Sequence, residues 1–212
     1  MNLWMFVIAF PLHLVFGQIV EYRLPEEKAP NTYIGNVAQD SNISQLAQPE
    51  DLKTMEYRFL SQSNPYAELF SIHETDAALY TAKQIDRETV CKFDDNCILR
   101  VDVIAKSKGN FYQKIQLNLQ ILDINDNSPT FSRGSIDVEL SEASSVGTSV
   151  QIEGAIDADT GTYSVQNYVI SPSDGPFDVH FQKNVDGSSI VKLVLRESLN
   201  REEREYYLIQ VT

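Results

Sequence analysis

The sequence is poor in basic residues and in recognisable catalytic motifs, and each shortage argues against a class of protein. Its 212 residues hold 17 Lys and Arg against 30 Asp and Glu, which gives a formal net charge of −13. Such a charge repels nucleic acids and anionic lipid surfaces, so neither is expected as a partner. The sequence also lacks the Gly-x-Ser-x-Gly, His-Glu-x-x-His and phosphate-binding-loop motifs. We therefore expect no enzyme of those types and no small-molecule substrate.

Long apolar runs are missing everywhere except at the N-terminus. The first 16 residues contain no charged side chain, yet this stretch is shorter than the roughly 20 apolar residues that span a bilayer. Val15 at position −3 and Gly17 at −1 fit a signal-peptidase site, which predicts a signal peptide over residues 1–17 and a mature start at Gln18. The missing basic n-region leaves an uncleaved strand or anchor as the alternative. A membrane anchor, if present, is expected beyond the last residue.

Cysteine is also scarce, with only Cys91 and Cys97 in the chain. A zinc site needs four ligands, and His73 and His180 have no suitable spacing to this pair. In an exported chain, two cysteines so close together predict a local disulfide, with two free thiols as the alternative. The chain has one N-x-[ST] sequon, at Asn42 in a polar segment, where we expect a glycan.

Alternating apolar and polar residues predict antiparallel β-strands. Residues 99–105 and 115–121 each place apolar side chains at every second position, which is the pattern of a sheet with one buried and one solvated face. No stretch of comparable length keeps a helical period, and the best candidate, residues 44–52, is interrupted by Pro49. The predicted fold class is all-β.

The chain also repeats itself. The segment around Glu142 matches the segment 116 residues earlier around Glu26, and Asn200 lies 114 residues after the similar segment at Asp86. Two segments with nearly equal offsets indicate tandem domains of a size typical of a β-sandwich. The predicted organisation is a first repeat, a linker and a second repeat that ends before its last strand, over residues 18–122, 123–129 and 130–212.

The predicted linker is rich in side-chain oxygen atoms. Its sequence is Asp123-Ile124-Asn125-Asp126-Asn127-Ser128-Pro129. Carboxylate and amide oxygens suit Ca²⁺, which takes 6–8 oxygen ligands, and suit zinc or copper poorly. An EF-hand loop starting at Asp123 fails, because Ser128 stands where the turn needs Gly and Gly134 where the bidentate Glu belongs. A loop starting at Asp157 fails at the same two positions.

The linker and three further motifs resemble the calcium-binding motifs of the cadherin superfamily. These are Pro25-Glu26 near the start of the first repeat, Ile85-Asp86-Arg87-Glu88 late in it, and Asp157-Ala158-Asp159 in the second. The resemblance implies tandem Greek-key, immunoglobulin-like sandwiches with about three Ca²⁺ ions at the junction. It implies these ligands: Glu26, Asp86, Glu88, Asp123, Ile124, Asn125, Asp126, Asn127, Asp157, Asp159 and Tyr163. Ile124, Asn127 and Tyr163 would bind through backbone carbonyls, and Tyr163 stands where the family usually has Asn.

Seven carboxylates in this set would converge on one junction. Two such charges about 4 Å apart repel by roughly 1 kcal/mol in water and several-fold more near a protein surface. Without Ca²⁺ the junction is expected to splay, and with Ca²⁺ the two repeats are expected to form a stiff rod.

Among cadherins, the sequence is most similar to protocadherins. The one tryptophan, Trp4, lies in the predicted signal peptide, so strand swapping through an N-terminal tryptophan is not expected. The segment 33–37 resembles the F-V-G-N-I strand of protocadherins, and Cys91 and Cys97 match their C-x5-C trait. The resemblance implies a single-pass plasma-membrane receptor that pairs with the same protein on another cell. A rod without homophilic adhesion and an enzyme with paired carboxylates, such as a glycosidase, are the alternatives.

Overall fold

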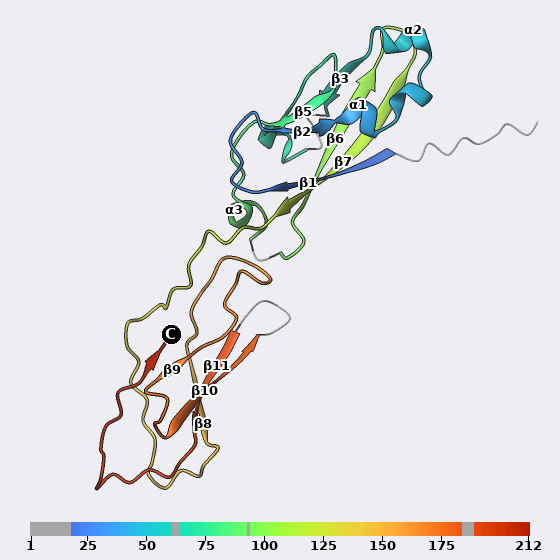
Figure 1. Cartoon of the computed structure of the whole chain (residues 1–212). Coiled ribbons are helices and arrows are strands. Elements are labelled where there is room, and N and C mark those ends of the chain that lie inside the picture. The colour runs from blue at the N-terminus through green and yellow to red at the C-terminus, as the bar shows by residue number, and fades with distance from the viewer. Residues whose placement is uncertain (1–17, 61–63, 93, 184–188) are drawn as a thin grey trace, which may run out of the picture. The chain divides into compact units, whose positions relative to one another are not determined.

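The computed structural model describes residues 18–60, 64–92, 94–183 and 189–212 (Figure 1). The predicted signal peptide, with Trp4, lies outside the described residues. The chain divides into two compact units, the first made of the chain up to Ile85 together with Ile98–Ile121, the second of Asp86–Cys97 and Leu122–Thr212. In the described part of the chain, no helix is long and apolar enough to cross a membrane.

The first unit contains two β-sheets. One has the strand order β1 (Gln18–Pro25), β7 (Tyr112–Leu122), β6 (Ile98–Lys106) and β3 (Glu56–Phe59). The other has the order β2 (Tyr33–Asn36), β5 (Ala78–Thr81) and β4 (Phe70–Ile72), with both pairs antiparallel. This unit is a β-sandwich, as the sequence pattern predicts.

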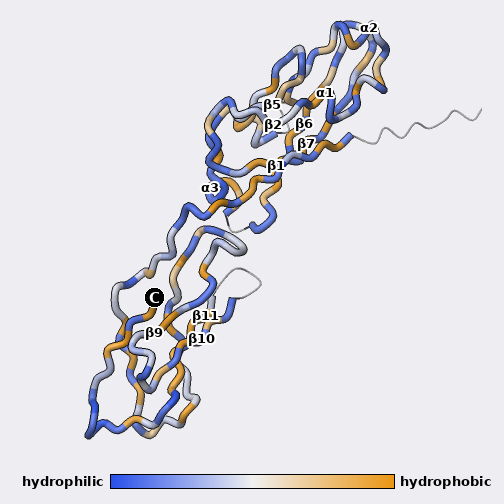
Figure 2. The backbone as a smooth tube through the Cα atoms, in the orientation of Figure 1, coloured by the Kyte–Doolittle hydropathy of each residue, from blue (hydrophilic) through white to orange (hydrophobic). Residues whose placement is uncertain are grey.

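The core of the first unit is built on β6 and β7, which pair antiparallel with Leu99 opposite Leu119 and Val101 opposite Leu117. Hydrophobic and hydrophilic residues alternate along these two strands (Figure 2), and every apolar residue that the alternation assigns to their inner face is buried. These residues are Leu99, Val101, Val103, Ala105, Ile115, Leu117, Leu119 and Ile121. Burying one Leu, Ile or Val contributes about 1.5–3 kcal/mol, so this face supplies much of the stability of the unit.

Four short helices join the strands of the first unit: α1 (Val37–Asp40), η1 (Ile43–Gln45), α2 (Pro49–Leu52) and η2 (Ala67–Leu69). Pro49, expected to interrupt a helix, instead begins α2. Proline suits the first helical position because the N–H that it lacks would have no helical partner there. The candidate helix over residues 44–52 is thus two separate single turns.

An asparagine side chain bonds the backbone of β6 at the point where the pairing of β6 with β3 ends. β3 pairs with β6 only as far as Phe59 opposite Val103. At the next position of β6, the Asn64 amide donates to the Asp102 carbonyl and accepts from the Asp102 N–H, both at 2.9 Å. The same carbonyl also accepts the Leu60 N–H at 2.9 Å, so the Asn64 side chain adds to the backbone pairing where β3 ends.

The second unit contains a sheet ordered β10 (Phe177–Lys183), β11 (Ser189–Leu195) and β8 (Ser149–Ile152), and a small sheet of β9 (Ile170–Ser171) and β12 (Gln210–Val211). Its core contains Ile170, Phe177, Leu193 and Leu195. In the small sheet, Gln210 lies opposite Ser171 and Val211 opposite Ile170. Together the two units make the fold all-β.

Candidate metal centre

The second unit begins with a short helix that carries two of the predicted motif residues. Helix α3 (Arg87–Cys91) starts after Asp86, whose two carboxylate oxygens accept the N–H and the hydroxyl of Thr89, both at 2.8 Å. This capping satisfies a backbone donor that the first turn leaves without a helical partner. It also sets Arg87 and Glu88 in the first turn of the helix.

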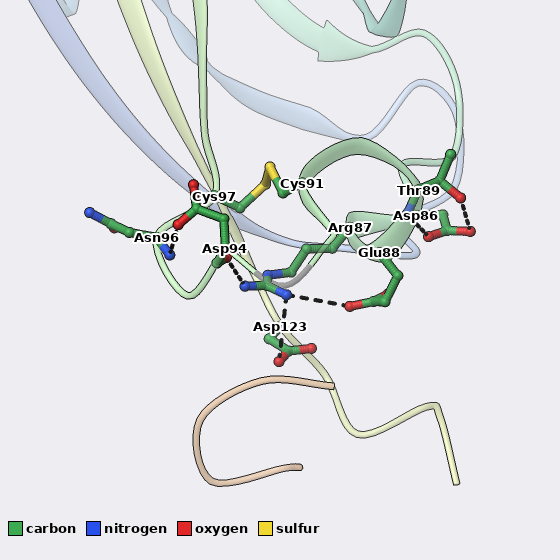
Figure 3. The surroundings of a disulfide bond; sticks show 9 residues. All are labelled: Asp86, Arg87, Glu88, Thr89, Cys91, Asp94, Asn96, Cys97 and Asp123. Atoms are coloured by element: carbon green, nitrogen blue, oxygen red, sulfur yellow. Dashed lines mark hydrogen bonds and ion pairs between the residues drawn. A yellow bond between two sulfur atoms is a disulfide. The ribbon is translucent and has the colours of Figure 1, made fainter. Parts of the chain in front are cut away.

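A disulfide follows directly at the end of this helix. Cys91 and Cys97 are bonded, which confirms the predicted pair and excludes two free thiols (Figure 3). Cys97 is only 1% exposed. The bond closes the short segment between the end of α3 and the start of β6 into a loop.

Asp123 approaches Glu88 from the predicted linker. Its Oδ2 accepts the N–H and the hydroxyl of Thr160, each at 2.6 Å, and lies 3.8 Å from the Arg87 guanidinium. Its Oδ1 is buried and accepts no hydrogen bond from the described residues. An acceptor in this position is costly unless another group meets it, which a cation would do.

The Asp157-Ala158-Asp159 segment lies beside the same linker. Asp159 is 2% exposed and accepts the side-chain amide of Asn127 at 2.8 Å. Asp157 accepts the Asp159 N–H through Oδ1, while its Oδ2 is buried and is met by no hydrogen-bond donor of the described residues. Burial, together with the nearby charge of Asp159, raises the pKa of Asp157. A carboxyl in this environment gains from a bound cation, which stabilises its charged form.

Three predicted ligands converge at this place. Glu88, Asp123 and Asp159 each offer a carboxylate oxygen, and the three oxygens lie within 4.8 Å of one another. Ca²⁺ binds oxygen at about 2.3–2.6 Å, so two oxygens on one ion can be about 5 Å apart at most. The spacing and the unmet oxygen of Asp123 fit a calcium ion. The donor set is all oxygen, as a hard cation requires.

The remaining predicted ligands have varied surroundings. Glu26, in the first unit, is buried at 2% exposure, and Asp86 is engaged as the cap of α3. Asn125 and Asp126 are exposed. The last three predicted ligands form local hydrogen bonds. The Ile124 carbonyl accepts the Asp126 N–H, and the Tyr163 N–H donates to the Thr160 carbonyl. The side-chain amide of Asn127 donates to the carboxylates of Asp126 and Asp159. Their calcium-binding roles stay predictions.

Two residues at this place were missed by the sequence reasoning. Arg87 lies inside the motif that supplied Asp86 and Glu88, and Thr160 directly follows Asp159. A signal for Arg87 was present, because the internal repeat carries an arginine, Arg201, at the matching position. The Arg87 guanidinium lies beside two of the predicted ligands, Glu88 and Asp123.

Comparison with known proteins agrees with the motifs. The family model described as Cadherin-like matches residues 19–107. Human protocadherin gamma-B4 is 33% identical over 193 residues, which is 91% of this chain, and human protocadherin-10 is 31% identical over 211 residues, which is 99% of it. The chain spans about a fifth of the length of these curated relatives.

Solved structures of protocadherins have the same fold. A crystal structure of protocadherin gamma C5 EC1-3 matches 87% of this chain and 56% of its own, with 32% identity and a TM-score of 0.69. A structure of PcdhgB3 EC1-4 matches 92% of this chain and 44% of its own, with 30% identity and a TM-score of 0.72. Residues 19–107 therefore form a cadherin-like domain, and the chain is similar to protocadherins over most of its length.

Proposed function

We propose that this chain is part of the extracellular region of a plasma-membrane receptor for calcium-dependent, homophilic cell adhesion. The observation that carries the proposal is the convergence of Glu88, Asp123 and Asp159 within 4.8 Å. These residues come from three separate motifs of a chain that is similar to protocadherins, which are adhesion proteins, over most of its length. Cadherin repeats bind calcium as a class, and the acidic group described above fits that property.

The calcium site is proposed to hold about three ions at the junction of the predicted repeats 18–122 and 130–212. Glu26, Asp86 and Glu88 would serve from the first repeat, the linker residues 123–127 from between, and Asp157, Asp159 and Tyr163 from the second. The ions supply positive charge that offsets the repulsion among seven carboxylates. Extracellular modules of this kind bind Ca²⁺ at about 0.1–1 mM, so the site would be filled outside the cell.

The partner is proposed to be the same protein on an apposed cell. This rests on the protocadherin resemblance and on the calcium-stiffened rod, which presents the repeats in a fixed order to an antiparallel copy. A rod that lacks homophilic adhesion would share the calcium site but not the self-recognition.

Aggregation of cells that express the complete receptor tests the proposal. Cells carrying the wild-type receptor should aggregate with one another in millimolar Ca²⁺, disperse in EDTA, and leave non-expressing cells out. Asp123→Asn should weaken aggregation, because it removes a charged oxygen from the group of three. Asp174→Asn, at an exposed turn of the same unit, is the matched control.

Two outcomes would contradict the proposal in different ways. Aggregation that is equal in calcium and EDTA would reject calcium dependence. Ca²⁺ uptake by the purified receptor without any cell aggregation would reject homophilic adhesion and favour the rod.

A further inference from the structure

Arg87 is the largest fully buried side chain in the described part of the molecule, and its neighbours are acidic. Its side chain is 1% exposed, with Nη1 at 3.4 Å from the Glu88 carboxylate and 3.8 Å from that of Asp123 (Figure 3). Arginine does not lose its proton in proteins, so this group remains a cation inside the structure. A permanent positive charge therefore lies against two of the three converging acids.

The other end of the guanidinium reaches the disulfide loop. Nη2 of Arg87 donates to the backbone carbonyl of Asp94, which lies between the two bonded cysteines. Asp94 is itself fixed by its side chain, which accepts the Asn96 N–H at 2.9 Å. The carbonyl that holds Arg87 thus belongs to a covalently closed segment.

We infer that Arg87 is a positioning residue for the calcium site and that the Cys91–Cys97 loop acts on the site through it. The inference rests on the proposed calcium function. The loop carbonyl orients one side of the planar guanidinium, and the other side then holds the carboxylates of Glu88 and Asp123 near each other before an ion arrives. Without Arg87, these two like charges repel and the oxygens move apart.

The charge count of the site supports this role. The seven carboxylates of the proposed site carry seven negative charges, and Arg87 reduces the sum to −6, which the three proposed Ca²⁺ ions offset. Lysine cannot replace the arrangement, because a single ammonium on a flexible stem has no rigid fork to bridge a loop carbonyl and two carboxylates. The identity of the residue, and not its charge alone, is therefore expected to matter.

The test is calcium titration of the secreted chain by calorimetry, with folding checked by circular dichroism. Arg87→Lys should weaken Ca²⁺ binding roughly tenfold or more, the size of effect typical for partners of metal ligands. Replacing both cysteines by serine, C91S with C97S, should weaken it in the same direction. Arg58→Lys is the control, since Arg58 forms exposed ion pairs with Glu56 and Glu74 in the first unit and should leave the affinity unchanged.

A second measurement needs no variant. Cys91 and Cys97 are the only cysteines, so reduction of the folded wild-type chain opens this loop alone and should weaken Ca²⁺ binding as the serine variant does. Combining Arg87→Lys with the serine pair should cost little more than the larger single effect, because both changes break one linkage.

The outcomes separate the inference from the function on which it rests. Unchanged affinity in folded Arg87→Lys, or in the reduced wild type, would overturn the inference while leaving the calcium site in place. Fully additive effects would overturn the linkage between loop and site. A wild-type chain that takes up no Ca²⁺ would overturn the proposed function, and the inference with it.

Discussion

Two copies of one short sequence motif differ in how deeply their arginine is buried. Arg87 and Arg201 occupy matching positions of the internal repeat, yet their side chains are 1% and 70% exposed. Arg87 is held between a loop carbonyl and two acids, whereas Arg201 pairs with Glu205 at 3.2 Å in solvent. The motif alone therefore does not decide whether its arginine is internal.

The residue before each arginine shows the same contrast. Asp86 caps helix α3 with both carboxylate oxygens, and the helix leads to the disulfide at Cys91. The side-chain oxygen of Asn200 accepts the Glu202 N–H at 3.2 Å, and residues 201–203 form a turn. In the first copy, a disulfide-closed loop follows the motif and Asp123 lies beside it, and the arginine is buried. In the second copy, the arginine forms an exposed ion pair.

The largest expected difference between the two sites is in stability. Arg87→Ala should lower the free energy of unfolding by about 3–5 kcal/mol, because it leaves buried carboxylates without their cation. Arg201→Ala should lower it by less than about 1 kcal/mol, since exposed ion pairs contribute little. Urea denaturation of both variants in EDTA measures the two values. Equal losses would mean that burial does not distinguish the copies.

Removing calcium should affect the motif beside the linker more than the strands of the first unit. Chelation is expected to expose residues 123–129 to proteases, while β6 and β7 stay protected. A tenfold excess of Ca²⁺ over its Kd should stabilise the folded state by about 1.4 kcal/mol. Limited proteolysis followed by mass spectrometry locates the cuts. Asp126→Ala should be the most sensitive linker variant, and cleavage indifferent to EDTA would contradict the site.

A smaller effect is expected at the caps. In EDTA, which removes any ion-binding effect, Asp86→Ala should cost about 1 kcal/mol, the usual value of an N-cap side chain. Asn200→Ala should cost less than about 0.5 kcal/mol, as exposed positions usually do. Thermal denaturation of the two variants side by side gives the comparison. A larger loss at Asn200 would show that the turn, and not the helix, depends on its side chain.

The smallest effect on stability is expected at Asn42, which is exposed in the first unit. Asn42 has a left-handed backbone, with φ of 49°, and its side chain does not cap η1. The side chain is thus available for a glycan. Glycosidase treatment of secreted protein should increase its gel mobility, and Asn42→Gln should remove that shift while changing the melting temperature little. Unchanged mobility of the wild type would reject the glycan.

The sequence predicted those parts of the molecule that follow a repeating pattern. The strict alternation from Leu99 and from Ile115 determines the inner face of β6 and β7, because a one-residue slip would expose every apolar side chain. The bond between Cys91 and Cys97 was predictable from their close spacing and from the predicted signal peptide. The grouping of Glu88, Asp123 and Asp159 followed from motif resemblance.

Other features leave too weak a signal in the sequence. Helix α3 has five residues, too few for a helical period to be recognised, and the motif that contains its cap, Asp86, predicts only a ligand there. Arg87 is buried only because segments distant in the sequence surround it, among them Asp123. Such tertiary surroundings do not follow from local pattern, so a charged residue next to a predicted ligand is easily taken as solvated.

The amide of Asn64 has a consequence for how copies of this chain behave in concentrated solution. A strand with free N–H and C=O groups is a template on which another chain can add a strand and begin an aggregate. Beyond Phe59, the Leu60 N–H and the Asn64 amide meet the Asp102 carbonyl, and the Asn64 side chain also accepts the Asp102 N–H. This stretch of backbone is thus occupied within the chain and is not left as a template for strand addition in concentrated solution.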